Sequence, residues 1–301
     1  MRVITMISGG GNIIVKGVGG LYTVMTPCGE RLECRARGNL RRLDPPPAVG
    51  DRVTLENGVI VSVEDRKNIL IRPFMANLDK LFIVVAVADP DPDPFYIDKL
   101  TVIAEHFYIE PVLVFNKCDL PDTKEIVNNY SHTPYKKYLI SAKDGVGIEP
   151  LAQEFKGVTS ALAGFSGAGK SSLLNALNRV CGGDDLAAVG NLSERLSRGK
   201  HTTRHAELFP LCGGLIADTP GFGSIELEYF GFNDRSTLIN CFPDLSEHTE
   251  GCRFSDCRHI KEKGCSLTSA IETDPVLKSR YSSFSRLYEE MGENKPWENK
   301  N

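Results

Sequence analysis

The order of the nucleotide-binding motifs is the feature that most constrains the fold of this chain. Asn116-Lys-Cys-Asp119 and Ser141-Ala-Lys143 have the form of guanine-recognition motifs, and both precede the phosphate-loop signature Gly164-Phe-Ser-Gly-Ala-Gly-Lys-Ser171. A threonine segment at 200–204 and Asp218-Thr-Pro-Gly221 come last. In the usual arrangement of a domain with these motifs, the phosphate loop comes first. The order therefore predicts a circularly permuted P-loop domain.

The composition is that of an ordinary globular protein with room for more than one domain. The 301 residues suffice for two or three cores, and 41% are hydrophobic and 25% charged. The net charge of -4 gives no indication of a nucleic-acid partner for the molecule as a whole, so any surface for such a partner must be local. The longest apolar run, Leu81 to Ala88, is far shorter than the roughly 20 residues of a membrane helix, and the first residues lack a secretory signal. We expect a cytoplasmic monomer that does not enter a membrane.

The chain has nine cysteines, an odd number, and a cytoplasm keeps thiols reduced. We therefore expect no disulfide framework. Three cysteines cluster with a histidine near the C-terminus. The dispersed cysteines are expected to be small apolar side chains in the cores: Cys28, Cys34, Cys118, Cys181, Cys212 and Cys241.

Residues 1–72 are expected to form an all-β barrel of the oligonucleotide-binding (OB) type. Short β-like runs alternate there with Gly, Asn and Pro, a pattern typical of a small five-stranded barrel. The segment has a local excess of basic residues and one aromatic candidate for stacking on a base, Tyr22. The alternative is an ordinary solvated strand face. The basic residues in question are Arg31, Arg35, Arg37, Arg41 and Arg42.

Residues 73–225 alternate between strand-like and helix-like segments, which predicts an α/β domain with a mostly parallel sheet covered by helices on both faces. The motifs follow strands, so they should meet at the carboxyl ends of the sheet.

Residues 226–301 are expected to form a mainly helical zinc-binding domain. Its long helix should begin at Asp274-Pro275 and stop near Gly292, because Asp is a favoured N-cap and Pro a favoured first residue.

The phosphate-loop signature predicts binding of a nucleoside triphosphate. Its glycines let backbone N–H groups converge on phosphates at the N-terminus of a helix. Lys170 is expected to neutralise the β- and γ-phosphates, and the Ser171 hydroxyl to bind Mg²⁺. The alternative is a glycine-rich turn used only for packing.

The threonine segment at 200–204 and the segment 218–221, the two switch segments, are expected to complete the metal and γ-phosphate contacts. Asp218 should hold Mg²⁺, usually through water, and the Gly221 N–H should sense the γ-phosphate. Thr202 or Thr203 should complete the metal shell. We favour Thr203, because a Thr-Arg pair occupies this position in related GTPases.

The residue after this last glycine is a phenylalanine. Ras-like enzymes place a water-orienting glutamine there, whereas Phe222 cannot orient or polarise water. Either intrinsic hydrolysis is slow or another residue supplies the polar group. His201 is our candidate, because an imidazole can orient an attacking water. The alternative for His201 is an ordinary surface histidine.

The guanine motif supplies hydrogen-bonding groups that match this base. Asp119 can accept from two donors on the base edge, a pair that adenine does not present. Asn116 supplies an amide near the base oxygen, and the aliphatic stem of Lys117 can cover the base face. The second base motif consists of Ser141, Ala142 and Lys143.

A cysteine and histidine cluster near the C-terminus has the composition of a zinc site. Cys252-x4-Cys257-x-His259-x5-Cys265 supplies three thiolates and one imidazole, which suits a tetrahedral ion. Four protein ligands leave no place for water, so the zinc ion would be structural. The alternative is a group of reduced, buried cysteines.

With guanine motifs first, then the phosphate loop, the two switch segments and the Cys-x4-Cys-x-His-x5-Cys cluster, the chain closely resembles the circularly permuted, small-subunit-dependent GTPases of bacterial ribosomes (the RsgA, YjeQ or YloQ family). The resemblance covers essentially the whole chain, and Phe222 also fits it. It carries over the base, switch and zinc positions given above, and it extends the GTP-binding phosphate segment to Gly164, Phe165, Ser166, Gly167, Ala168, Gly169, Lys170, Ser171 and Ser172.

The resemblance also implies a function. It implies a GTP hydrolase stimulated by the small (30S) ribosomal subunit, acting late in the maturation of that subunit and contacting 16S rRNA. The ligands would be GTP and GDP, with Mg²⁺ beside the nucleotide and one structural Zn²⁺. The alternative class is an RNA-binding assembly chaperone for which GTP is only a conformational ligand.

Overall fold

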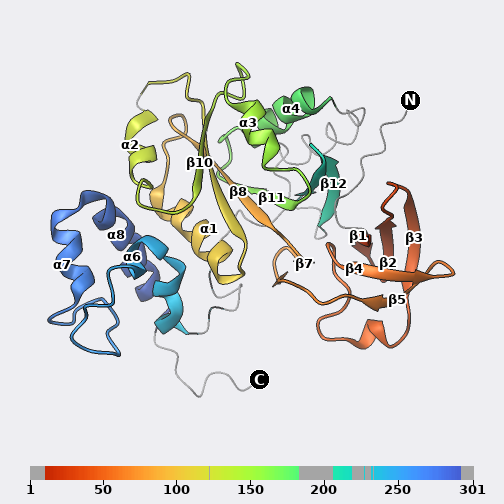
Figure 1. Cartoon of the computed structure of the whole chain (residues 1–301), viewed down its shortest axis with the longest axis horizontal. Helices are drawn as coiled ribbons and strands as arrows, with labels where there is room; N and C mark the ends of the chain where they lie inside the picture. The colour runs from red at the N-terminus through yellow and green to blue at the C-terminus, as the bar shows by residue number, and fades with distance from the viewer. Residues whose placement is uncertain are drawn as a thin grey trace.

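The computed structural model describes residues 11–121, 123–182, 206–218, 227, 232 and 234–292. A β-barrel, a central sheet with helices and a group of C-terminal helices follow one another along the chain. In Figure 1 the red and orange barrel and the blue C-terminal helices lie on opposite sides of the central sheet. None of the described helices has the length and apolar character needed to cross a membrane. The domain limits at residues 72 and 225 stay predictions.

Five short strands near the N-terminus close into a barrel. They are β1 (Asn12–Val18), β2 (Leu21–Met25), β3 (Arg31–Ala36), β4 (Arg52–Glu56) and β5 (Val59–Val63), with a 3-10 helix, η1 (Leu40–Arg42), between β3 and β4. β1, β2 and β3 form an antiparallel meander, β3 pairs with β5 in parallel, and β4 pairs with both β5 and β1. Ile14, Val24 and Ile60 are fully buried in this part. The predicted five-stranded barrel is confirmed.

A short hairpin connects the barrel to the central sheet. It consists of β6 (Ile69–Leu70) and β7 (Met75–Ala76). The segment before it is held against the barrel by an ion pair, because Arg66 Nε and Nη2 each donate to the buried carboxylate of Asp51 at 2.8 Å.

The central sheet has six strands in the order β10-β9-β8-β11-β13-β12. Five of them run parallel, and β12 is antiparallel to β13. The strands are β8 (Lys80–Ala86), β9 (Glu110–Asn116), β10 (Lys136–Ile140), β11 (Thr159–Ala163), β12 (Glu207–Leu211) and β13 (Gly214–Asp218). β8, the first of these six strands in chain order, thus lies inside the central sheet rather than at its edge.

Helices cover both faces of this sheet, as predicted. They are α1 (Pro94–His106), α2 (Thr123–Asn128), α3 (Ile148–Gln153) and α4 (Lys170–Cys181). Alternate residues of β8 belong to separate cores: Leu81 and Ile83 share one with residues of α1, and Phe82 and Val84 share the other with residues of α3 and α4. α1 begins where Asp93 accepts a hydrogen bond from the backbone N of Phe95 and Pro94 occupies the first turn.

The barrel and the central sheet are joined by strand pairing. Edge strand β12 pairs with β1, with Lys16 opposite Glu207, so the hydrogen-bonded sheet runs without a break through eleven strands. Glu207 also forms ion pairs with Lys16 at 3.0 Å and with Arg31 at 3.8 Å. Local sequence patterns do not predict this pairing, because it depends on a contact between segments far apart in the chain.

Within residues 234–292, the structure describes four helical segments, as predicted for a mainly helical region. They are η3 (Arg235–Cys241), α6 (Pro243–Ser246), α7 (Ser266–Thr273) and α8 (Pro275–Glu290). α8 begins as expected, because the Asp274 side chain accepts from the backbone N–H groups of Val276 and Leu277, and Pro275 is its first residue. One face of α8 packs on α1.

The prediction for the dispersed cysteines is wrong for three of the six. Cys181 and Cys212 form a disulfide with a Cα–Cα distance of 5.2 Å, because the last turn of α4 lies beside the turn between β12 and β13. Cys28 is exposed rather than buried. Cys34 and Cys241 are buried as expected, and Cys118 is partly exposed.

Glu154, which directly follows α3, provides a test of the contacts between this helix and the strands β8 and β10. Burial by itself raises the pKa of Glu154, but hydrogen bonds from Lys80, Lys136 and Tyr138 outweigh it and lower the pKa from 4.5 to about 2. We expect Glu154→Gln to lower the free energy of unfolding by about 1–3 kcal/mol at pH 7, because these donors lose their anionic acceptor.

The pH dependence of that loss follows from the lowered pKa. The ionised carboxylate stabilises the fold fully above pH 4.5, and this contribution disappears as the pH falls towards 2. Urea unfolding at several pH values should therefore show the gap between wild type and variant closing on acidification. Glu149→Gln, at an exposed position of α3, is the matched control. A gap that stays constant down to pH 3 would contradict the assignment.

Candidate nucleotide site and metal centre

The two base motifs, the phosphate loop and Asp218 all lie at the carboxyl ends of parallel strands. β9 ends at Asn116, β10 ends one residue before Ser141, and β11 ends one residue before Gly164. These strands are parallel, so their carboxyl ends lie on the same side. β13 ends there too, at Asp218, whose backbone pairs with Glu207.

The phosphate loop requires glycine at two positions for steric reasons. Gly164 has φ +142°, and a Cβ there would lie 2.2 Å from the carbonyl oxygen of Val84. Gly169 has φ +91°, and a Cβ there would lie 2.2 Å from Nδ2 of Asn116. Both positions therefore exclude any residue with a side chain. Gly169 directly precedes α4, so the loop leads into a helix N-terminus that favours anions.

Lys170 is folded back onto the phosphate loop. Its Nζ donates to the carbonyl oxygens of Gly164 and Phe165, each at 2.7 Å. Burial lowers the pKa of Lys170. Phosphate oxygens would compete with these two carbonyls for the ammonium group. Ser171 and Ser172 follow in the first turn of α4, the first partly buried and the second exposed.

Asn116 connects the base motifs to the phosphate loop. Its Nδ2 donates to the carbonyl oxygen of Ala168 at 2.9 Å, and its Oδ1 accepts from the backbone N of Ala142 at 3.0 Å. The side chain is buried, with 3% of the residue exposed. The prediction placed this amide near the base, and the structure gives it a second role between two loops.

The other base residues lie beside this bridge. Lys117 has φ +67°, and its Nζ contacts the carbonyl oxygen of Asp89. Asp119 and Lys143 are exposed. Ser141 Oγ donates to Asp144 Oδ2 at 2.8 Å, which fixes the turn that follows β10. The sequence prediction did not include Asp144; the available signal was Ser141, whose hydroxyl also accepts from the backbone N of Asp144 at 3.2 Å, as serines in turns do.

Several predicted residues lie outside the described part of the chain. They are His201, Thr202, Thr203, Gly221 and Phe222, and only the backbone of Asp218 is described. Their roles stay predictions.

The barrel residues predicted to contact nucleic acid have mixed outcomes. Tyr22 is 9% exposed and cannot present a ring to a base, because its position in β2 faces the barrel interior. The prediction for Tyr22 is therefore wrong. Arg31, Arg35, Arg37 and Arg42 are exposed, and Arg31 contacts Glu207.

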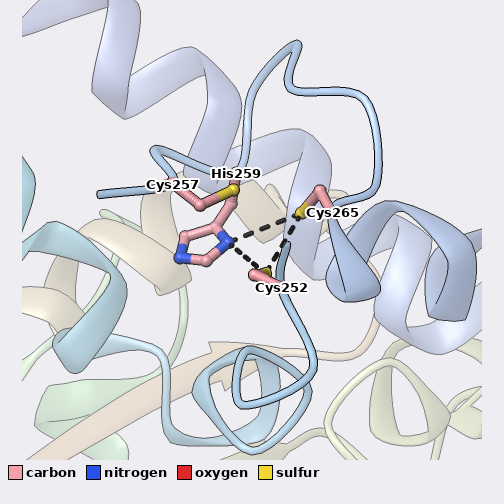
Figure 2. Close-up of side chains that lie close together, drawn as sticks. All are labelled: Cys252, Cys257, His259 and Cys265. Atoms are coloured by element: carbon pink, nitrogen blue, oxygen red, sulfur yellow. Dashed lines mark hydrogen bonds between the residues drawn. The ribbon is translucent and has the colours of Figure 1, made fainter. Parts of the chain in front are cut away.

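The four residues of the Cys/His cluster come together as predicted. Their ligand atoms, from Cys252, Cys257, His259 and Cys265, all lie within 4.8 Å of one another (Figure 2). Nδ1 of His259 is 3.5 Å from the sulfurs of Cys252 and Cys265, and these two sulfurs are 3.8 Å apart.

These distances fit a tetrahedral zinc ion. Bonds of about 2.3 Å to sulfur and 2.0–2.1 Å to nitrogen place two sulfurs about 3.8 Å apart, and a sulfur and a nitrogen about 3.5 Å apart. Burial also lowers the pKa of His259, which favours the neutral imidazole that binds metal. The cluster can therefore hold zinc through Nδ1 and three thiolates.

Two residues that were not predicted from the sequence stabilise the loop that carries the cysteines and histidine of the cluster. The Glu262 carboxylate accepts from the backbone N–H groups of Arg258, Ile260 and Lys261 at 2.9–3.0 Å. Tyr281 of α8 donates through its hydroxyl to the carbonyl oxygen of His259 at 2.8 Å. The position of Glu262 between the ligands was the available signal.

The sheet, its loops and the flanking parts together define a class of protein. A phosphate loop that follows the guanine motifs, on a mostly parallel sheet between a five-stranded barrel and a helical Cys/His region, is the circularly permuted P-loop GTPase fold. The chain belongs to the RsgA GTPase family. The RsgA GTPase family model matches residues 63–228, and the RsgA N-terminal domain model matches residues 11–59.

Individual relatives cover nearly the whole chain. The small ribosomal subunit biogenesis GTPase RsgA of Clostridium beijerinckii is 38% identical over 285 residues, which is 92% of this chain and 96% of that protein. The crystal structure of YjeQ from Thermotoga maritima has a TM-score of 0.78 and 36% identity, covering 94% of this chain and 98% of that one. YloQ, a circularly permuted GTPase, has a TM-score of 0.75 and 30% identity, covering 95% and 96%.

Removing the Asn116 bridge should weaken nucleotide binding. In Asn116→Ala both hydrogen bonds are lost, each worth about 0.5–1.5 kcal/mol, so we expect GDP affinity to fall about tenfold or more. Isothermal titration calorimetry measures this. Asn128→Ala, at an exposed position of α2, should bind GDP like the wild type. Unchanged affinity in Asn116→Ala would exclude the bridging role.

Metal analysis should find one zinc ion per chain, held by the Cys/His cluster. We expect Cys265→Ser, or treatment with a chelator, to lower the melting temperature and increase protease cleavage between residues 252 and 265, because metal binding contributes to folding. Cys28→Ser, which changes an exposed cysteine far from the cluster in sequence, should keep the full zinc content. Full zinc content in Cys265→Ser would rule out this ligand set.

Proposed function

We propose that this protein is a GTP hydrolase that acts in the biogenesis of the small ribosomal subunit. The observation that carries the proposal is the phosphate loop bridged to two guanine motifs by Asn116, in the permuted order of the RsgA GTPase family. Its relative in Clostridium beijerinckii is named a small ribosomal subunit biogenesis GTPase. We propose late maturation of the subunit as the step concerned.

In the proposed reaction, water attacks the γ-phosphorus of GTP and the bond to the β–γ bridging oxygen breaks. The protein contributes positioning and charge neutralisation. Lys170 exchanges its two loop carbonyls for β- and γ-phosphate oxygens, and the backbone N–H groups of Gly164–Ser172 surround the phosphates. Asp119 and Lys117 bind the guanine.

The oxygen donors at the phosphate loop suit a hard divalent cation. We propose that Ser171, Thr203 and Asp218 hold the Mg²⁺ that accompanies GTP. The bound ion would neutralise charge on the β- and γ-phosphates. His201 is proposed to orient the attacking water, because Phe222 cannot, and the Gly221 N–H to sense the γ-phosphate.

The flanking parts are proposed to bind the small subunit through 16S rRNA in the cytoplasm, with the protein acting as a monomer. The exposed arginines of the barrel carry positive charge on one side of the central sheet, and exposed basic residues around the Cys/His cluster carry it on the other: Arg253, Arg258, Lys261 and Lys263. Phosphate contacts of this kind depend on local rather than net charge. One structural Zn²⁺ in the cluster would keep its basic loop in place.

The alternative is an RNA-binding assembly chaperone for which GTP is only a conformational ligand. Phe222 is the feature that favours this alternative, because it cannot orient a water molecule for hydrolysis. However, the family to which the chain belongs is named for GTPase activity. The phosphate loop of this chain also carries both Lys170 and Ser171. The alternative is therefore not favoured.

Turnover assays test the proposal directly. We expect GTP hydrolysis to be slow alone and to rise at least tenfold with purified small subunits, but not with large subunits or bare RNA. A phosphate-release assay at saturating GTP measures this. Lys170→Ala should abolish both rates. Equal rates with and without small subunits would remove the central claim.

The same assay tests the water-positioning role. His201→Ala should bind GTP normally and lose the stimulated rate, because stimulation requires an oriented water. A stimulated rate equal to that of the wild type would reject His201.

A further inference from the structure

Helix α1 lies between the phosphate loop and the C-terminal helix α8. Near its start, the ring of Tyr96 stacks on the ring of Phe165, with centroids 3.9 Å apart and an interplanar angle of 29°. Phe165 is the second residue of the phosphate loop, and its carbonyl oxygen accepts from Lys170 Nζ at 2.7 Å. Tyr96 therefore holds the backbone segment to which the catalytic lysine is bonded.

Two residues further along, α1 is fixed to the C-terminal helices by buried charges. The Asp98 carboxylate contacts the Arg280 guanidinium of α8, and each residue is only 1% exposed. Arg280 Nε also donates to Asp244 of α6 at 2.9 Å. Tyr130 donates to Asp98 at 2.9 Å. Because an unpaired buried charge is costly, α1 and α8 cannot separate without large loss of stability.

A second group of contacts surrounds this buried network at the same end of α1. Lys99 Nζ forms an ion pair with Glu290 at 2.8 Å. The Arg286 guanidinium lies 3.7 Å from the centroid of the Phe95 ring. Every contact named here from α1 to the phosphate loop or to α8 thus comes from four residues near its start: Phe95, Tyr96, Asp98 and Lys99. Residues two apart on a helix point in different directions, so one turn can serve both neighbours.

We propose that Tyr96 is a positioning residue of the phosphate loop and that α1 links nucleotide binding to the placement of α8. This inference rests on the proposed function. When a phosphate group binds, Lys170 Nζ leaves the carbonyl oxygen of Phe165. The phosphate-loop backbone at Phe165 can then shift, and this shift changes the stacking of the Phe165 ring on Tyr96. The change reaches Arg280 through the rigid first turns of α1. By thermodynamic linkage, if nucleotide shifts α8 toward one placement, the protein with α8 in that placement must bind nucleotide more tightly by the same factor.

This route differs from simple core packing of Tyr96. A packing role predicts that replacing the ring lowers stability equally with and without nucleotide. A linking role predicts that the response of α8 to nucleotide depends on the ring. The distinguishing quantity is therefore the nucleotide-dependent difference in α8, rather than stability.

Amide hydrogen exchange of the full chain, with and without saturating GDP, measures this quantity. In the wild type we expect GDP to slow exchange within 275–290 about fivefold or more, the lower end of typical coupling. In Tyr96→Leu, saturated with GDP, this slowing should be lost, while Tyr96→Phe should retain it through the stacked ring. Tyr108→Leu is the matched control, because Tyr108 follows α1 and is 90% exposed.

A variant on the far side tests the same link in reverse. Asp98→Asn, Asp244→Asn and Arg280→Met combined remove the buried charges together, which avoids leaving one unpaired. We expect this variant to bind GDP at least fivefold more weakly, although none of its changes touches the phosphate loop.

The outcomes separate this inference from the proposed function. GDP binding and stimulated turnover with no response of α8 in the wild type would overturn the inference alone. The same slowing in Tyr96→Leu as in the wild type, or unchanged GDP affinity in the triple variant, would also overturn it. Failure of the wild type to bind GDP would overturn both.

Discussion

The buried amide of Asn116 is the contact on which the nucleotide site depends. It joins the loop after β11 to the loop after β10 from a position at the end of β9, so one side chain sets the distance between phosphate and base recognition. The site survives the permuted chain order because the contact depends on which strands are neighbours in the sheet. β9, β8 and β11 lie side by side whichever of them comes first in the chain.

The flanking parts attach to the central sheet in different ways. The barrel joins it through backbone pairing between β1 and β12, with Glu207 between two basic side chains. The C-terminal helices attach through side chains, with Arg280 buried between Asp98 and Asp244. Backbone pairing tolerates many substitutions, whereas a buried guanidinium with two carboxylates tolerates few. The two attachments therefore place different demands on the sequence.

Local patterns predicted much of this structure. The cap and first turn of α8 are predictable from Asp274-Pro275, and the alternation of strand-like and helix-like segments predicted the mostly parallel sheet. The Cys/His spacing identified the metal cluster. Two features that need contact between distant segments were missed or wrong: the Cys181–Cys212 bond and the pairing of β12 with β1. In both cases the deciding partner lies far away in sequence, where periodicity and spacing carry no information. The prediction for Tyr22 was wrong for a local reason: Tyr22 lies on the same side of β2 as the buried Val24.

The permuted order of the strands and their loops also has a consequence for synthesis of the protein. The ribosome makes the base-recognition loops first and the phosphate loop afterwards, and β13 emerges last of the parallel strands. A growing chain that already contains Asn116 lacks Ala168, the acceptor of its amide. An unfinished copy therefore has no complete nucleotide site, and only a chain made through β13 can enter the cycle of GTP binding and release.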